Sequence, residues 1–327
     1  MYSNTESLAE RLAAVKIDET HFKSKQLPIK AGNALPIAYG GFCIGFAVNA
    51  ATATVPEGRH LYSILGQFLG PVSIEDHITC EVSSHRETRS FSSRQVRVFQ
   101  QQPDGKNRMC LMILMDFRTL EPALLEYAPA PSMQYTEAEQ CPTTQQIQDS
   151  LIARGEMTER GAKAFAQFMG PLQAFFETRQ CPEGISAQNL TGIAKKLKTT
   201  QEHLPTTEKT SAEWVRCHKY DTPAASRFGN VGFMMDAGLS FLPLVHEHLF
   251  FDDTGACSTL EFAIRIWHPT PDLTTWHLRE RKTINANGGL TYSEGRLWSQ
   301  DKKTLVASMT QQCILRPRPV RPKKASL

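Results

Sequence analysis

One order of elements, an apolar helix followed by four strands, occurs twice along the 327 residues of this chain and limits the folds that it can adopt. In the first copy, the small and apolar stretch GGFCIGFAVNAATATV predicts a tightly buried helix over residues 40–55, and strand-like runs follow at 61–69, 77–83, 91–100 and 109–117. In the second copy, VGFMMDAGLSFLPLV predicts a helix over 231–245, and strand-like runs follow at 259–267, 276–282, 290–299 and 304–315. The sequence therefore predicts a duplicated unit.

The spacing of short strings supports the duplication. Phe68-Leu69-Gly70-Pro71 lies 198 positions before Ile266-Trp267-His268-Pro269, and Asp116-Phe117-Arg118 lies 198 positions before Ile314-Leu315-Arg316. Each unit also needs a strand before its helix, which residues 21–27 and 214–220 can supply. Short turn signals between the last two strands of each unit are typical of antiparallel sheets. Each unit is therefore predicted to be an antiparallel sheet wrapped around a buried helix.

The segment between the two units differs from both of them in composition. It contains a proline-rich loop at 127–131, apolar residues at helical spacing over 162–176 and a polar stretch at 199–210. We therefore expect three parts: an N-terminal repeat over residues 1–125, a linker with helices over 126–209 that packs against both repeats, and a C-terminal repeat over 210–327.

Composition and charge narrow the class of protein. With 41% apolar and 21% charged residues, the chain is typical of a globular protein. Its net charge of +3 is weak and dispersed, so the sequence does not predict a nucleic-acid partner. No apolar run approaches the roughly 20 residues that span a bilayer. The sequence therefore predicts no membrane span.

Eight cysteines are widely spaced and form no C-x-x-C pair, which predicts reduced thiols in an intracellular protein. Residues 1–10 are polar and carry acids, so no secretory signal is expected there. The chain ends in Ala325-Ser326-Leu327, which is related to peroxisomal signals but has Ser at the penultimate position. A cytoplasmic or peroxisomal location is expected, with a frayed basic tail as the preferred interpretation of the C-terminus.

Strings in both halves resemble those of a known family, in the same order and over nearly the whole chain. In the first half they are Tyr39-Gly40-Gly41, Thr54-Val55-Pro56-Glu57-Gly58-Arg59, Leu61-Tyr62-Ser63, Phe68-Leu69-Gly70-Pro71 and Arg89-Ser90-Phe91-Ser92-Ser93-Arg94. In the second half they are Met235-Asp236-Ala237-Gly238-Leu239-Ser240-Phe241-Leu242-Pro243 and Leu305-Val306-Ala307-Ser308-Met309-Thr310-Gln311-Gln312. In these strings the chain resembles the type II acyl-CoA thioesterases. The resemblance implies an α+β fold, a double hot-dog in which two antiparallel sheets are each wrapped around a long helix.

The resemblance also implies a catalytic trio. Matched motif by motif, it falls on Asp236 in the second helix, Thr259 at the start of the next strand and Gln311 in the last strand. All three residue types are retained, so the C-terminal repeat is expected to carry the active site.

The sequence departs from the family pattern at three places. Tyr62 stands where the family has His, Gly70 stands where an Arg precedes the Pro, and Glu261-Phe262 stands where an Asp-His pair is usual. These departures leave open an unusual acyl chain.

Asp236 also stands out without the family. It is the only charged residue between Arg227 and His246, and its neighbours at helical spacing are mostly apolar. A carboxylate in such surroundings is costly unless it has partners. A functional role is therefore favoured over an exposed helix end or a cap.

Gln311 lies on one strand face with the apolar residues Ala307, Met309, Cys313 and Leu315. A lone amide on such a face needs a hydrogen-bond partner, so Gln311 is either functional or a structural amide that ties down a loop. With the 198-residue offset, the first-half counterpart of Gln311 is Ile113 and that of Thr259 is Leu61. Because both counterparts are apolar, one active site per chain is expected.

The expected reaction is hydrolysis of acyl-CoA to the free acid and CoA through a water held by Asp236, Thr259 and Gln311, without a metal or a redox cofactor. One alternative is a hot-dog dehydratase, isomerase or other tailoring enzyme that acts on an acyl or polyketide intermediate. The dehydratases need an Asp and a His five residues apart, and here Phe241 lies five residues after Asp236. The other alternative is a non-catalytic acyl-binding protein.

The expected partner is acyl-CoA or another acyl thioester. Each repeat leaves one sheet edge that the other repeat can pair inside the chain, so either a monomer or a homo-oligomer is compatible with the sequence.

Overall fold

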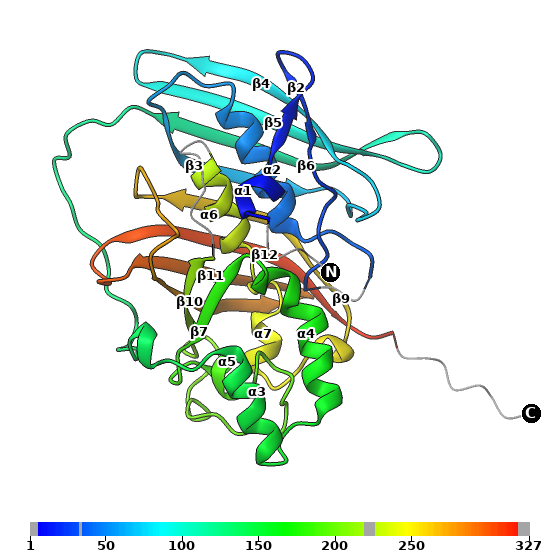
Figure 1. The fold of residues 1–327 in the computed structure, drawn as a ribbon, viewed down its shortest axis with the longest axis vertical. Coiled ribbons are helices and arrows are strands. Elements are labelled where there is room, and N and C mark those ends of the chain that lie inside the picture. Colours follow the sequence, from blue (N-terminus) through cyan, green and yellow to red (C-terminus); the bar gives the residue numbers. More distant parts are fainter. Residues whose placement is uncertain (1–5, 33–34, 219–225, 320–327) are drawn as a thin grey trace, which may run out of the picture.

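A computed structural model describes residues 6–32, 35–218 and 226–319, and the basic tail discussed above lies outside them. Within these residues, twelve strands form one antiparallel sheet in the order β1-β2-β4-β5-β6-β3-β9-β12-β11-β10-β8-β7. The first half of the chain lies at the top of Figure 1 in blue to cyan, and the second half lies below it in yellow to red.

The first half begins with a short helix and then follows the predicted order. Its elements are α1 (Leu8–Arg11), β1 (Ala14–Lys16), β2 (His21–Ser24), α2 (Gly40–Thr52), β3 (His60–Phe68), β4 (Thr79–Glu87), β5 (Phe91–Gln101) and β6 (Asn107–Arg118). The predicted helix over 40–55 and the four strands after it are confirmed, with ends that shift by a few residues.

The second half repeats this order. Its elements are β8 (Ser211–Cys217), α6 (Arg227–Met235), α7 (Leu242–His246), a 3-10 turn η3 (Phe251–Asp253), β9 (Thr254–Ile266), β10 (His277–Asn287), β11 (Leu290–Ser299) and β12 (Leu305–Pro317). The two halves mirror each other around the pair β3 and β9, since β2-β4-β5-β6-β3 in one corresponds to β8-β10-β11-β12-β9 in the other. The predicted duplication is therefore confirmed.

The two sheets are joined edge to edge. Ile64 of β3 pairs with Ile264 of β9, so each repeat closes the edge that the other leaves open. The remaining edges in the described chain are β1 and β7, strands of 3 and 5 residues. Short edge strands limit pairing with other chains.

A bulge in each central strand fixes how the two halves correspond. Tyr62 bulges out of the β3–β6 ladder, and Leu260 bulges out of the β9–β12 ladder, 198 positions later as predicted. The residue opposite each bulge is Phe117 in β6 but Cys313 in β12, only 196 positions later. The chain from β9 to β12 in the second half is therefore two residues shorter than the chain from β3 to β6 in the first half.

This shorter offset corrects one prediction. Gln311 corresponds to Met115 and not to Ile113, although both first-half residues are buried and apolar.

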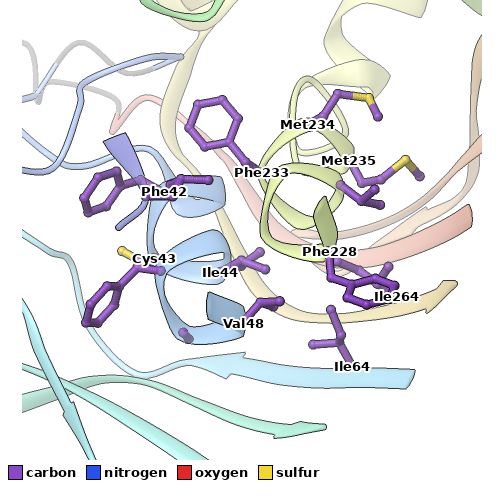
Figure 2. Close-up of a cluster of buried hydrophobic side chains, with 14 of the residues drawn as sticks. Phe42, Cys43, Ile44, Val48, Ile64, Phe228, Phe233, Met234, Met235 and Ile264 are labelled. Carbon is purple, nitrogen blue, oxygen red and sulfur yellow. The ribbon is translucent and has the colours of Figure 1, made fainter. Parts of the chain in front are cut away.

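Helices α2 and α6 pack against each other inside the curve of the sheet. Figure 2 shows Ile44 and Val48 of α2 on the side that faces α6, with Ile64 and Ile264 of the paired strands alongside. The helices approach closely because glycines face each other: a Cβ on Gly45 would lie 2.9 Å from the carbonyl oxygen of Gly229. Each large apolar side chain buried here stabilises the fold by about 1.5–3 kcal/mol.

The second predicted helix, over 231–245, is wrong in its continuity. It consists of α6 and α7, and the chain between them turns at Gly238, where φ is +87°. An L side chain rarely adopts this conformation, so glycine ends a helix here. Pro243 then lies in the first turn of α7, where a missing N–H costs nothing. Both signals were present in the sequence.

The segment between the halves contains η1 (Ala138–Gln140), α3 (Thr144–Ala153), α4 (Glu159–Gln173), β7 (Phe176–Gln180) and α5 (Ile185–Gln188). Its first part is anchored on the second half: Ser132 and Tyr135 donate hydrogen bonds to Glu280, and the Trp298 indole donates to the carbonyl of Pro129. It then supplies β7 at the edge of the sheet and places α3 and α4 in green below it in Figure 1.

None of the eight cysteines, all of which lie among the described residues, forms a disulfide in this structure. Among the described residues, no helix is long and apolar enough to cross a membrane.

Candidate active site

Asp236 is the residue that ends α6, so its carboxylate projects from the C-terminal end of that helix. Its side chain is buried between the two halves. Gln311 is fully buried in β12, where the alternation of the strand places it on the core face with Met309 and Cys313. Thr259 lies within β9, which begins five residues earlier than the strand start that the sequence predicted.

The three predicted side chains are joined by hydrogen bonds. The hydroxyl of Thr259 donates to Oε1 of Gln311 at 3.4 Å, and Nε2 of Gln311 donates to Oδ1 of Asp236 at 2.5 Å. The amide thus has a partner on both of its ends, and its orientation is set by one donor and one acceptor. The structure brings together residues that lie 52 and 75 positions apart in the sequence.

The carboxylate of Asp236 has an unusual acidity. Burial raises its pKa to about 6 because the charged form loses its hydration. Three groups act against burial by favouring the charged form: the Gln311 amide, the backbone N–H of Gly41 and the positive charge of Arg279. At neutral pH the carboxylate is therefore mostly ionised and can accept a proton.

The N-terminus of α2 faces this carboxylate. Its unpaired N–H groups and the helix dipole favour negative charge there. Gly40 packs closely against the acid, since a Cβ at this position would lie 3.0 Å from Oδ2 of Asp236 and 3.0 Å from the Phe68 ring. A side chain at residue 40 would therefore crowd both the carboxylate and the ring.

A cavity of about 420 Å³ opens next to Asp236 and Thr259. Its walls are mainly apolar and come from three parts of the chain. The first half contributes Tyr39, Cys43, Phe68, Leu69 and Val72, the segment between the halves contributes Met169 and Leu172 of α4, and the second half contributes Phe241, Cys257 and Leu260. The three predicted residues belong to the C-terminal repeat, but the cavity beside them does not belong to one repeat alone.

Sequence reasoning missed the walls from the first half and from α4, since no local pattern says which surfaces meet. It also missed a buried ionic cluster of Glu213, Arg279 and Arg281 next to Asp236. The sequence offered one weak signal: Arg279 and Arg281 are two residues apart and therefore share one face of a strand. Charged side chains are rarely buried, and nothing in the polar residues around them predicts their burial.

The other groups near the cavity are poor candidates for catalysis. Burial raises the pKa of the Cys257 thiol to about 11 and that of Cys313 to about 12, so neither is a thiolate at neutral pH. Phe241, the residue five positions after Asp236, packs against the rings of Phe168 and Phe251. No histidine occurs among the described residues that line the cavity, so the Asp-His arrangement of the dehydratases has no counterpart in it.

No three His, Cys, Asp or Glu side chains cluster as a metal site in the part of the chain that the structure describes. His246 is buried, and its Nε2 lies 3.0 Å from the Ser211 hydroxyl.

Comparisons with known proteins agree with this architecture. The family model of the acyl-CoA thioesterase N-terminal domain matches residues 28–118, and that of the acyl-CoA thioesterase C-terminal domain matches residues 162–315. Acyl-CoA thioesterase 2 of Haemophilus influenzae is 24% identical over 311 residues, which cover 95% of this chain and 97% of that protein.

Two solved structures have a similar fold. The acyl-CoA thioesterase II TesB2 of Mycobacterium marinum has a TM-score of 0.68 at 16% identity, over 95% of this chain and 98% of its own. A protein of unknown function with a hot dog fold from Alicyclobacillus acidocaldarius has a TM-score of 0.66 at 15% identity, over 95% of this chain and 98% of its own. With both family models matched in order across the two halves, the chain belongs to the type II acyl-CoA thioesterases, a family of thioester hydrolases with the double hot-dog fold.

Proposed function

We propose that this chain hydrolyses an acyl-CoA thioester with a water molecule that Asp236 activates and that Thr259 and Gln311 orient. The observation that supports this most is the hydrogen-bond chain from Thr259 through Gln311 to a buried carboxylate at the wall of an apolar cavity. An acyl chain fits such a cavity, because apolar walls with a few polar groups at one end are typical of sites for small apolar ligands.

In the proposed reaction, Asp236 takes a proton from water while the water oxygen attacks the thioester carbonyl carbon. The carbonyl oxygen gains the negative charge of the tetrahedral intermediate. When the carbon–sulfur bond breaks, the CoA sulfur leaves with the electron pair and receives the proton that Asp236 holds. The products are the free acid and CoA, and Asp236 returns to its ionised form.

The acidity of Asp236 suits this role. A base works best when its pKa is close to the working pH, and burial brings that of Asp236 to about 6. The carboxylate must be ionised to act, so activity is expected to rise with pH through about 6 and to level off above it. Thr259 and Gln311 carry no charge and act by orientation.

The test is a hydrolysis assay of the purified protein on a panel of acyl-CoAs of increasing chain length, followed by release of the CoA thiol. Asp236→Asn keeps the size of the side chain but removes the base, and we expect a loss of about 10³-fold or more in kcat. Asp149→Asn, at an exposed carboxylate on α3, is the matched control and is expected to keep full activity.

Parent-level hydrolysis by Asp236→Asn would refute the assignment of the base. No release of CoA from any acyl-CoA by the parent would refute the proposed substrate.

A further inference from the structure

Two arginines are buried beside the acid that we propose as the base. Arg279 is 5% exposed and Arg281 is 4% exposed, and both point from β10 toward the end of α6. Glu213 of β8, directly opposite Arg279 in the sheet, lies between them. Buried guanidinium groups are costly and need both charge balance and hydrogen bonds.

The two guanidinium groups donate hydrogen bonds to the backbone around Asp236. Nη1 of Arg279 donates to the carbonyl of Met234, two residues before the acid, and Nη1 of Arg281 donates at 3.4 Å to the carbonyl of Ala237, one residue after it. Both carbonyls lie at the C-terminal end of α6, where the helix dipole places partial negative charge, and that of Met234 also accepts from the backbone N–H of Ala237. The two side chains therefore hold the turn from which the Asp236 carboxylate projects.

Glu213 holds the two arginines in place. It accepts from Nε of Arg279 at 3.0 Å and also from its Nη2, while Nη2 of Arg281 lies 3.6 Å from its other oxygen. The Gln180 amide donates to that same oxygen at 2.9 Å. The backbone is shaped to admit this arrangement, because a Cβ on Gly238 would overlap Nη1 of Arg281.

The cluster has one excess positive charge. Nearby positive charge lowers the pKa of Glu213 to about 2. Burial lowers the pKa of Arg281 to about 10, which is still well above neutral, so at neutral pH one carboxylate faces two guanidinium groups. Glu280 of β10 is also buried, but it accepts from the hydroxyls of Ser132 and Tyr135. Asp236 is the buried carboxylate whose ionised form Arg279 favours.

The other titratable groups that face Asp236 are neutral at pH 7. Tyr39 before α2, Cys43 in α2 and Cys313 in β12 all have a pKa that burial raises well above neutral. Ionised Asp236 thus balances the excess charge.

We propose that Arg279 and Arg281, held by Glu213, are positioning residues that fix the carboxylate of Asp236 at the end of α6 and balance its negative charge. This inference rests on the proposed role of Asp236 as the base. It adds that β8 and β10, which do not line the cavity, set both the place and the charge of the catalytic group.

The test is the pH profile of kcat in charge variants that change the cluster in opposite directions. Arg279→Met removes a positive charge, so the acid limb, the rise of kcat with pH that follows ionisation of Asp236, is expected to have its midpoint about one pH unit higher. The loss of kcat is then near tenfold at pH 5 and largely disappears at pH 9. Glu213→Gln removes a negative charge, so the limb is expected to move down. Arg279→Lys keeps the charge but loses the fork of donors, so kcat falls while the limb stays near that of the parent.

Controls separate position from charge. KM is expected to change less than twofold in each variant, because neither arginine lines the cavity near the acyl chain. Arg296→Met, at a partly exposed arginine of β11 paired with Glu294, is the matched control and keeps the parent profile. A carbon-13 NMR titration of the Asp236 carboxyl group measures its pKa independently of activity. The signal is identified because it is missing from the spectrum of Asp236→Asn, and the titration can be made on every variant that folds.

If the variants lower kcat equally at every pH and the titration of Asp236 does not move, the cluster is only structural and the inference is wrong. If Asp236→Asn keeps parent activity, the proposed function itself fails, and this result is distinct because it does not depend on the arginines.

Discussion

The two halves of this molecule share one strand order but differ where chemistry needs polar groups. In the second half, Thr259 and Gln311 face the buried Asp236, whereas the corresponding residues in the first half are Leu61 and Met115, both buried. Even the bulges that interrupt the central strands lie at corresponding places. The comparison teaches that the repeat specifies the fold, while a few substitutions on its inner face decide which half has the polar groups of the proposed active site.

The first half still takes part, because it supplies the N-terminus of α2 and much of the cavity wall. The backbone N–H of Gly41 favours the ionised form of Asp236, and Phe68 lines the cavity next to it. The two halves therefore contribute different parts: the second half provides the polar side chains, and the first half provides the helix terminus and much of the apolar wall.

Among substitutions that exchange residues between the two halves, the largest expected effect comes from making the second half resemble the first. Gln311→Met replaces the amide by the residue type of its counterpart, and it should lower kcat by about 10²–10³-fold because it removes a donor from Asp236 and the acceptor of Thr259. Steady-state hydrolysis of the best acyl-CoA measures this loss. Unchanged kcat would mean that Gln311 is a structural amide.

The reverse substitution should fail to create a site and should harm the fold. Met115→Gln buries an amide without the partners that Gln311 has, at a cost of about 2–4 kcal/mol in the free energy of unfolding. We expect kcat per folded molecule to stay within twofold of the parent. Chemical denaturation and the hydrolysis assay measure the two quantities, and a gain in activity would show that the first half is closer to catalysis than its residues indicate.

Substitutions on α4 should change chain length preference without touching the polar residues. Met169→Trp or Leu172→Trp fills part of the cavity, so the kcat/KM for long acyl chains relative to short ones should fall about tenfold. Gln167→Trp, at an exposed position of the same helix, is the matched control. An equal loss for all chain lengths would place the acyl chain elsewhere.

The smallest expected effect is on stability. The folded pKa of Asp236 is about 6 against an ordinary 3.8, so the folded state binds this proton more tightly than the unfolded state does. Stability from this group is therefore full below about pH 4 and falls as the pH rises to about 6. Asp236→Asn removes the cost of burying a charged carboxylate, so it should be more stable than the parent by about 1 kcal/mol at pH 8 but not at pH 4. The gain is small because the Asn amide faces hydrogen-bond donors on both sides.

Thermal unfolding at the two pH values measures this difference. An equal effect at pH 4 and pH 8 would show that Asp236 is not a buried acid with a raised pKa.

Much of the fold could be predicted because its signals are local. Alternating runs gave the strands, and the small apolar stretch over 40–55 gave α2. The break between α6 and α7 was missed because the apolar run continues through Gly238, so the glycine and Pro243 did not interrupt the predicted helix although both are signals of a helix boundary. The 198-residue offset was accurate for β3 and β9 but not for β6 and β12, since connections can lose residues without changing the sheet.

The site was predictable only in part. The type and order of Asp236, Thr259 and Gln311 followed from motifs, but their contacts depend on how three separate elements meet. The ionic cluster behind them joins β8, β10 and the end of α6, a combination that no sequence spacing records. The walls of the cavity depend in the same way on the packing of α4 against both halves.

The central claim is that each chain has one catalytic site, with the thioester at Asp236 and the acyl chain in the cavity between the halves. A crystal structure with an acyl-CoA analogue in which a thioether replaces the thioester tests this most directly. We expect one analogue per chain, with its sulfur next to Asp236 and its acyl chain against Phe68 and Met169. An analogue bound beside Leu61 and Met115 of the first half, or an acyl chain outside the cavity, would contradict the account.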